Sequence, residues 1–152
     1  MMTFLFLIAC ICALGMSLRG DPLHNLMINP AAAVLRRTGT LFFLEYPVRL
    51  QNGTTDYVDL LVRTPAFDLA LEFETTPRHV LDNAQKAQAA GLILWVVVPN
   101  DHVQKSVARK LEGSNLRPGG LPIRIFNVGQ LLQELITIFP RHIKEKPMEK
   151  GT

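Results

Sequence analysis

The stretch that decides the fold is Asp59-Leu-Leu-Val-Arg-Thr-Pro-Ala-Phe-Asp-Leu-Ala-Leu-Glu72-Phe-Glu74-Thr-Thr. Its two ends are rich in residues that favour strands, and turn-forming residues lie between them, so the pattern predicts a β-hairpin. Three carboxylates, those of Asp59, Glu72 and Glu74, interrupt these apolar strands. Acidic residues are depleted in strands, so their presence here points to a site and not only to a sheet.

The expected loop, Pro65 to Asp68, sets the register of this hairpin and puts Asp59 opposite Glu74 and Glu72 opposite Leu61. Residues two apart on a strand share a face, and cross-strand partners share one too. All three carboxylates are therefore expected on one patch. Like charges opposed on a sheet destabilise it by roughly 0.2–1 kcal/mol, so a cation is expected beside them. Oxygen ligands of this kind suit Mg²⁺ or Mn²⁺.

Two alternatives bear on these acids. Asp56 could be the functional aspartate, although the three apolar residues that follow Asp59 are what a buried strand requires. Glu72 could be an exposed strand residue paired with a base such as Arg63. The alternation of the strand favours a site instead, because it leaves Glu72 and Glu74 together on the face opposite the apolar one. That apolar face is formed by Leu69, Leu71 and Phe73.

A helix and a buried strand are expected after the hairpin. Thr75 or Thr76 can cap the helix, Pro77 suits its first turn, and apolar residues recur at helical spacing up to Gly91. The uninterrupted apolar run from Leu92 to Pro99 is typical of a strand buried on both faces. Strand, helix and strand then form a right-handed crossover unit. The helical stripe consists of Val80, Leu81, Ala84 and Ala87.

The remaining elements follow from periodicity and from turn signals. They are a helix over His24 to Arg37 that Pro30 should break or restart, a strand over Thr40 to Leu50, a turn at Asn52-Gly53, a helix from Asp101 to Leu111, a strand from Leu121 to Phe126 and a helix from Val128 to Ile138. The expected order is therefore α-β-β-β-α-β-α-β-α, with a central mixed β-sheet flanked by helices.

At this point the chain resembles the core of the PD-(D/E)XK, or restriction-endonuclease-like, nuclease superfamily. The features that carry the resemblance are Asp59, the Glu72-Phe-Glu74 triplet on the next strand, a helix with Gln85 and Lys86, and the buried strand that follows. The resemblance covers about residues 41 to 135. It implies a restriction-endonuclease-like α/β fold for the domain over residues 21–139.

In that superfamily an Asp and a Glu or Asp bind a divalent metal, and a residue two positions further on, usually Lys, positions or activates the attacking water. The resemblance implies that Asp59 and Glu72 are metal ligands and that Glu74 occupies the Lys position, where it would add a ligand or orient the water. That is a departure from the common motif. Some members recruit a Lys from the next helix, which makes Lys86 the candidate substitute and Gln85 an auxiliary candidate; a solvated helix face is the plain alternative for both.

The function implied by this resemblance is Mg²⁺- or Mn²⁺-dependent endonucleolytic hydrolysis of DNA phosphodiester bonds. DNA would be the partner, together with a second copy of the chain or a recruiting protein, because a chain this small has no separate recognition domain. A catalytically inactive nuclease-like module that binds DNA or a protein is the alternative, and the missing Lys after Glu72 favours it. A membrane-tethered structural domain is a third reading, favoured only by the N-terminal segment.

Length and composition set the bounds of these expectations. With 152 residues, of which 48% are hydrophobic, the chain can form one α/β domain with a real core. The net charge of +3 is a modest basic bias, compatible with nucleic acid. Cys10 and Cys12 are the only cysteines, so neither a disulfide framework nor a zinc site is legible, and a reducing, cytoplasmic location is expected.

The two ends of the chain are expected to lie outside the domain. Residues 1–20 form an apolar segment that reads as a membrane anchor, as a signal-like segment or as a start-site artefact with Met16 as the true start. Membrane association through residues 1–18 is thus the alternative to a cytoplasmic location. Residues 140–152 read as a basic, flexible tail.

Overall fold

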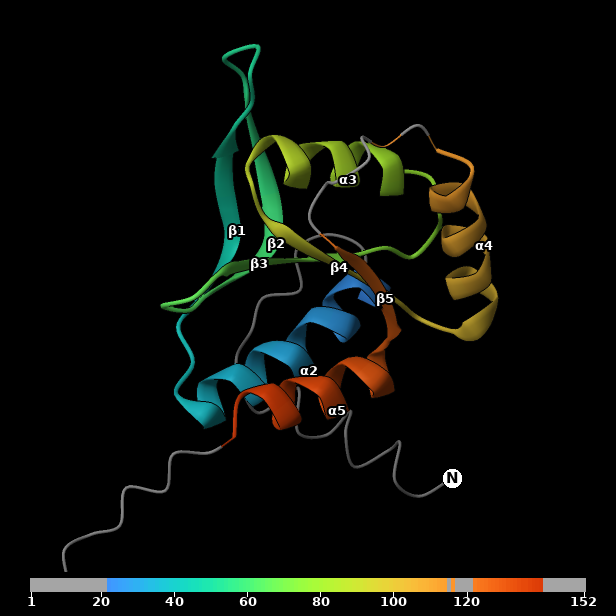
Figure 1. Cartoon of the computed structure of the whole chain (residues 1–152). Coiled ribbons are helices and arrows are strands. Elements are labelled where there is room, and N and C mark those ends of the chain that lie inside the picture. The colour runs from blue at the N-terminus through green and yellow to red at the C-terminus, as the bar shows by residue number, and fades with distance from the viewer. Residues whose placement is uncertain (1–21, 115, 117–121, 141–152) are drawn as a thin grey trace, which may run out of the picture.

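The computed structural model describes residues 22–114, 116 and 122–140 of the chain (Figure 1). The described elements follow one another in the expected order, α-β-β-β-α-β-α-β-α. They are α2 (Pro22–Thr38), β1 (Phe42–Arg49), β2 (Thr55–Arg63), β3 (Asp68–Phe73), α3 (Val80–Ala89), β4 (Ile93–Val98), α4 (Asp101–Glu112), β5 (Ile123–Asn127) and α5 (Val128–Ile138).

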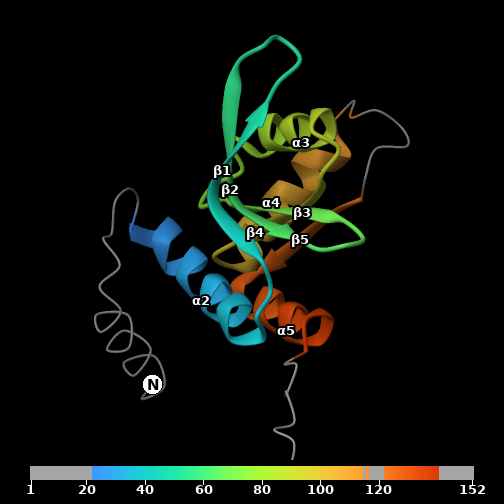
Figure 2. The same ribbon diagram turned by 90° about the vertical axis from the view of Figure 1, so that its left-hand side faces the viewer.

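The strands form one five-stranded mixed sheet in the order β1-β2-β3-β4-β5. The first three strands are antiparallel neighbours, whereas β3, β4 and β5 run parallel to one another. Parallel neighbours need a crossover, and α3 and α4 supply the two crossovers here. Helices α2 and α5 lie side by side on one face of the sheet, and α3 and α4 lie on the other, while the β1–β2 hairpin projects beyond them (Figures 1 and 2). The protein is therefore a three-layered mixed α/β structure.

Two apolar cores fill the spaces between these layers. The core under α2 and α5 takes one face of β3 through Leu69, Leu71 and Phe73. The core under α3 and α4 takes the other face through Ala70, and the buried residues of α3 belong to it. The expected apolar face of β3 is thus confirmed. The expected helical stripe is confirmed as well, because its members Val80, Ala84 and Ala87 are buried and Leu81 packs against them.

The sequence pattern was most accurate where burial is uniform. Strand β4 is buried along nearly its whole length, as its apolar run predicted. Helix α5 begins and ends where it was expected, and a capping box between Asn127 and Gln130 fixes its first turn.

Helix α2 corrects one expectation, because Pro30 neither breaks nor restarts it. A proline inside a helix removes one hydrogen bond and costs about 3 kcal/mol or more. The helix nevertheless continues because six of its apolar side chains are buried against the sheet and α5, and such packing supplies most helical stability in proteins. They are Met27, Ile28, Ala31, Ala32, Val34 and Leu35.

Helix α3 corrects a second expectation, because it begins at Val80 and is capped by neither Thr75 nor Thr76. Its start is delayed because tertiary partners hold the preceding segment. The Glu74 N–H donates to Val97 O at 2.8 Å, which keeps the chain alongside β4. Lys110 Nζ on α4 then donates to the carbonyl oxygens of Pro77 and Arg78, at 2.8 and 2.9 Å.

The β2–β3 hairpin differs from the expected register by two residues. Arg63 pairs with Asp68, and Leu61 pairs with Ala70 and not with Glu72. The same register, continued beyond the last hydrogen-bonded pair, puts Asp59 across from Glu72 and not from Glu74. An even shift keeps every side chain on its face, so Asp59 and Glu72 still share a face although the expected pairing was wrong.

The shorter turn has a local cause. The Thr64 hydroxyl donates to Phe67 O at 2.8 Å and accepts the Phe67 N–H at 3.0 Å, so Thr64 and Phe67 close the turn themselves. This places Asp68 in β3, where its carboxylate pairs with the Arg63 guanidinium at 3.2 Å. Side-chain bonds of threonine and an ion pair therefore set the register, and the strand pattern alone does not encode them.

Strand β1 contains a backbone irregularity next to the acidic patch. Glu45 has a φ of 48°, and among the described residues it is the one non-glycine residue with a positive φ. Its neighbours pair regularly, Leu44 with Leu60 and Tyr46 with Val58, so Glu45 lies across from Asp59 without pairing with it. Left-handed backbone costs a residue with a Cβ about 1 kcal/mol or more.

The expected N-terminal segment, residues 1–20, lies outside the described residues, and so does the expected tail over residues 140–152 except for residue 140. The membrane association expected of residues 1–18 lies outside them as well. Within the part of the chain that the structure describes, no helix is long and apolar enough to cross a bilayer.

Replacing Glu45 by Gly should leave the free energy of unfolding unchanged or raise it by up to about 1 kcal/mol, because glycine adopts positive φ without strain. Glu45→Val should lower it by about 1–2 kcal/mol, since a β-branched residue is disfavoured there. Urea denaturation measures both. The control is Leu44→Gly at the adjacent, regularly paired strand position, which should lose about 1 kcal/mol. A loss of equal size in Glu45→Gly would contradict the strain at this residue.

Candidate functional site

Asp59 lies where β2 and β3 stop pairing, and its side chain takes the place of a backbone partner. Its Oδ2 accepts the N–H of Phe73 on β3 at 2.8 Å and lies 3.0 Å from Nε2 of His24 on α2. The Asp59 side chain is 27% exposed. The carboxylate thus sits at the boundary between solvent and the sheet, held from two sides.

Glu72 and Lys86 form a buried ion pair beside Asp59. Lys86 Nζ on α3 lies 2.8 Å from Glu72 Oε1, and the two side chains are 6% and 4% exposed. The same ammonium donates to Tyr57 O on β2 at 2.5 Å. Asp56 Oδ2 lies 3.8 Å away, on a side chain that is 55% exposed. Of the two candidate aspartates, Asp56 is thus the more exposed, and Asp59 is the one held by the sheet and by α2.

The contact between Lys86 and Glu72 is electrostatic rather than a directed hydrogen bond. Among the described residues, Glu72 Oε1 is the one buried side-chain oxygen or nitrogen atom that makes no hydrogen bond of regular geometry. Buried acceptors are nearly always satisfied in folded proteins, and an exception calls for a ligand, a water or a functional explanation. Glu72 Oε1 thus has a charged neighbour, the Lys86 ammonium at 2.8 Å, but no hydrogen bond of regular geometry.

Glu74 follows β3 and turns toward α3. Its Oε1 accepts a short hydrogen bond from Asn83 Nδ2. Glu74 is buried to about the same degree as Lys86. Asp59 is close enough to Glu72 and Glu74 to act on both electrostatically, and Lys86 contacts Glu72 from the next helix. Gln85, the auxiliary candidate, lies on the exposed side of α3, away from this group.

The carboxyl groups of Asp59 and Glu72 have opposite pKa shifts. Burial and the negative charge of Asp59 raise the pKa of Glu72 to about 8, against the attraction of the Lys86 ammonium. Burial would raise the pKa of Asp59 too, but hydrogen bonds with His24 and the Phe73 N–H outweigh it and hold that pKa below its usual value. Burial and the charge of Asp59 thus favour the neutral form of Glu72, whereas the Lys86 ammonium favours its ionised form.

The pKa of Glu74 is raised, as is that of Glu72. Its burial and then the charge of Asp59 raise its pKa, while His79, the Asn83 amide and His24 act against the rise. A patch with one ionised carboxylate and two that resist ionisation is an environment that a cation would stabilise.

The donors of this patch suit a hard divalent cation. Mg²⁺ is commonly bound by one or two carboxylates, with water and a phosphate completing its shell. Asp59 and Glu72 would provide such a pair. Across residues 22–114, 116 and 122–140, no three His, Cys, Asp or Glu side chains are arranged as a metal cluster.

Sequence reasoning missed His24, Asn83 and the carbonyl oxygen of Tyr57. Asn83 lies three residues before Lys86, and this helical spacing is the one signal that could have found it. His24 lies 35 residues before Asp59 on a helix of the opposite layer. No sequence spacing encodes this contact, because it depends on how α2 packs across the sheet.

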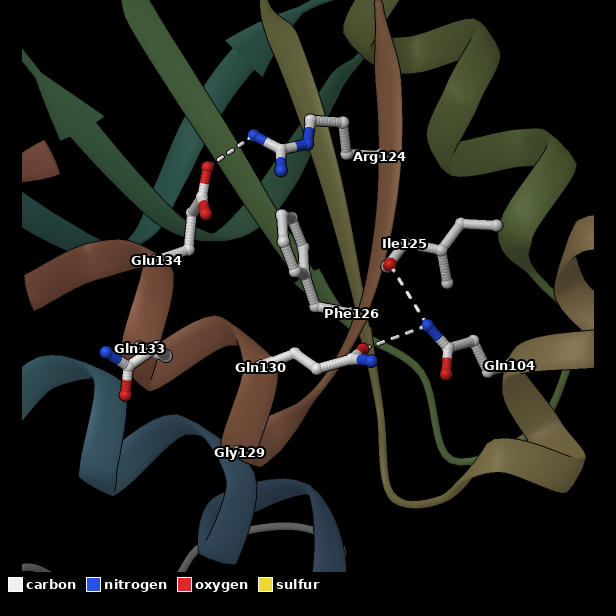
Figure 3. Close-up of a pocket in the computed structure, with 8 residues that line it drawn as sticks. All are labelled: Gln104, Arg124, Ile125, Phe126, Gly129, Gln130, Gln133 and Glu134. Atoms are coloured by element: carbon white, nitrogen blue, oxygen red, sulfur yellow. Dashed lines mark hydrogen bonds and ion pairs between the residues drawn. The ribbon is translucent and has the colours of Figure 1, made fainter. Parts of the chain in front are cut away.

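A separate hollow lies at the β5 edge, between α4 and α5, and contains none of the predicted site residues (Figure 3). Gln104 Nε2 donates there to Ile125 O at 3.2 Å and to Gln130 Oε1 at 3.0 Å. Arg124 lies over the Phe126 ring, 4.7 Å from its centroid, and pairs with Glu134. The Gln104 amide covers a carbonyl of an edge strand, so these contacts are explained by protection of the sheet edge.

Comparisons with known proteins do not assign this site. No protein-family model matches the sequence, and no curated protein is significantly similar to it. Among solved structures, the crystal structure of a protein of unknown function, AF1548, aligns with a TM-score of 0.44 and 13% sequence identity. The alignment covers 72% of this chain and 67% of that one. The function has to be argued from the geometry of the site.

The pKa of Glu72 predicts how stability depends on pH in the metal-free protein. The folded state keeps the proton up to about pH 8, whereas the unfolded chain releases it near pH 4.5. The stabilisation is therefore fully present below about pH 4.5 and is lost as the pH rises through about 8. Glu72→Gln, which mimics the neutral acid, should flatten this fall and be more stable than wild type at alkaline pH.

Urea denaturation in EDTA across this pH range tests the prediction. Glu112→Gln, at an exposed position on α4, is the control and should keep the wild-type profile. If Glu72→Gln also follows the wild-type profile, Glu72 is ionised in the folded protein and the prediction is wrong.

Proposed function

We propose that this chain is a restriction-endonuclease-like nuclease that hydrolyses DNA phosphodiester bonds with the help of Mg²⁺ or Mn²⁺. One observation carries the proposal. Asp59 on β2, Glu72 on β3 and Lys86 on α3 converge where the two strands part, with Lys86 Nζ 2.8 Å from Glu72 Oε1. The element order supports it, because the resemblance to that superfamily implies two acids on adjacent strands followed by a helix and a buried strand.

In this proposal Asp59 and Glu72 hold the metal ion, and Glu74 adds a ligand or orients the attacking water. Bound there, the ion would lower the pKa of a water molecule and neutralise charge on the phosphate. Glu72 would release its proton when the ion binds, because a carboxylate must be deprotonated to act as a ligand. The raised pKa of Glu72 makes binding tighter as the pH increases toward about 8.

Lys86 would take over the task of the motif lysine that Glu74 replaces. Its ammonium is tied to Tyr57 O and to Glu72, so it is held at the inner side of the carboxylates. A fixed positive charge in a water-poor site stabilises charge that develops on a phosphate more strongly than it would in water. Lys86 therefore acts as an electrostatic stabiliser of the transition state.

A second function, a nuclease-like module that binds DNA or a protein without catalysis, is favoured by one specific observation. The Glu72 and Lys86 side chains are 4% and 6% exposed and paired with each other. Buried pairs of this kind also occur as structural elements, where loss of one partner is strongly destabilising. Binding of Mn²⁺ separates the two functions, since a structural pair has no need of a divalent ion.

The motif substitutions give the test of activity. Asp59→Asn and Glu72→Gln should abolish Mg²⁺-dependent nicking of plasmid DNA, because each removes a ligand charge. Lys86→Ala should lower the nicking rate by about one to three decades if it stabilises the transition state. Glu74→Lys restores the commoner motif and should keep or increase the rate.

Lys105→Ala, at an exposed position on α4, is the matched control for Lys86→Ala and should be as active as wild type. Circular dichroism checks that each variant is folded. If wild type and Glu74→Lys are both inert with Mg²⁺ and with Mn²⁺ on supercoiled, linear and single-stranded DNA, catalysis is excluded and the binding module takes its place.

A further inference from the structure

Helix α2 brings one side chain to the acidic patch, and neither the motif nor the proposed chemistry uses it. His24 Nε2 lies 3.0 Å from Asp59 Oδ2, and the His24 side chain is 30% exposed. The ring also meets the Phe73 ring edge-on, with centroids 6.2 Å apart and an interplanar angle of 84°. The imidazole is therefore oriented by packing on the same residue whose N–H binds Asp59.

The chemistry of the contact fixes which group donates. An ionised carboxylate only accepts hydrogen bonds, so His24 must present Nε2–H to Asp59 Oδ2. Phe73 N–H donates to the same oxygen at 2.8 Å. Both donors thus hold Oδ2, and neither takes Oδ1. Two donors on one oxygen fix the direction of the carboxylate and keep the other oxygen available.

We propose that His24 is a positioning residue for Asp59: it donates Nε2–H to Oδ2, holds the carboxylate against the Phe73 amide and thereby turns Oδ1 toward the site. The consequence for ion binding rests on the function proposed above. Partners that hydrogen-bond to a metal ligand fix its orientation, and their removal typically costs 10–100-fold in metal affinity.

The location of His24 explains why α2 is suited to this task. The next two buried residues of the helix, Met27 and Ile28, lie in the core between α2 and the sheet. The backbone that carries His24 is thus anchored within one helical turn of the contact. A donor on a packed helix is held more firmly than one on a loop, as positioning of a ligand requires.

Two kinds of variant separate the donor from the ring. His24→Phe keeps a ring against Phe73 but has no donor, and His24→Leu is a second donor-free variant. His24→Gln loses the ring but can present an amide N–H at about the reach of Nε2. If the N–H donor positions the Asp59 carboxylate, the Phe and Leu variants lose this positioning and the Gln variant retains it.

The first readout needs no metal and is the amide signal of Phe73 in ¹⁵N-resolved spectra with EDTA. In the Phe and Leu variants Asp59 is free to rotate, so this signal should shift upfield and its hydrogen exchange should accelerate about tenfold or more. In the Gln variant both should stay close to wild type. An unchanged Phe73 amide in the donor-free variants, or an equal change in all three, overturns the proposal.

The second readout is Mn²⁺ affinity, measured by calorimetry on the full chain. Wild type and His24→Gln should bind alike, and His24→Phe about 10–100-fold more weakly. If His24→Phe binds Mn²⁺ as tightly as wild type, His24 does not position the ligand. If it binds more tightly, His24 competes with the ion for Asp59. Either result overturns its positioning role. If wild type itself binds no Mn²⁺, the proposed function fails, and the Phe73 amide still decides whether His24 orients Asp59.

Discussion

The constraint on which this structure depends is that two acidic side chains meet in a place with little water. Asp59 and Glu72 cannot both be ionised there unless positive charge accompanies them. The protein meets the constraint in three ways at once: His24 and the Phe73 amide stabilise the charge of Asp59, the pKa of Glu72 is raised, and Lys86 Nζ lies 2.8 Å from Glu72 Oε1. Every layer of the fold contributes to this arrangement, since α2, the sheet and α3 each supply a member.

The group around Glu72 also differs from an ordinary ion pair. A structural pair is complete with two partners, whereas here Glu72 Oε1 lies 2.8 Å from Lys86 Nζ without the geometry of a hydrogen bond, and the charge of Asp59 opposes the ionisation of Glu72. Both features are costly in a protein interior. In the function proposed above, a bound cation would offset this cost.

The sequence predicted the elements and the faces, and missed what depends on individual side-chain contacts. Alternation on β3 put Glu72 opposite the apolar face, and this survived an error in register because the error was even. The register itself depended on hydrogen bonds of Thr64, and the start of α3 on the reach of Lys110. The role of His24 was out of reach because it requires the packing of a helix across the sheet. Local periodicity encodes burial, whereas long-range contacts appear only in the assembled fold.

The order in which these parts come together follows from the parallel pairing of β3 and β4. The β2–β3 hairpin, closed by a short turn, places Asp59 across from Glu72 through contacts that are local in the sequence. Strand β4 can join β3 only after the chain has crossed over through α3, and α3 carries Lys86. The crossover that extends the sheet is thus also the step that delivers the positive charge. An isolated two-stranded hairpin is marginally stable at best in water, so the crossover that completes the sheet also secures the acidic hairpin within it.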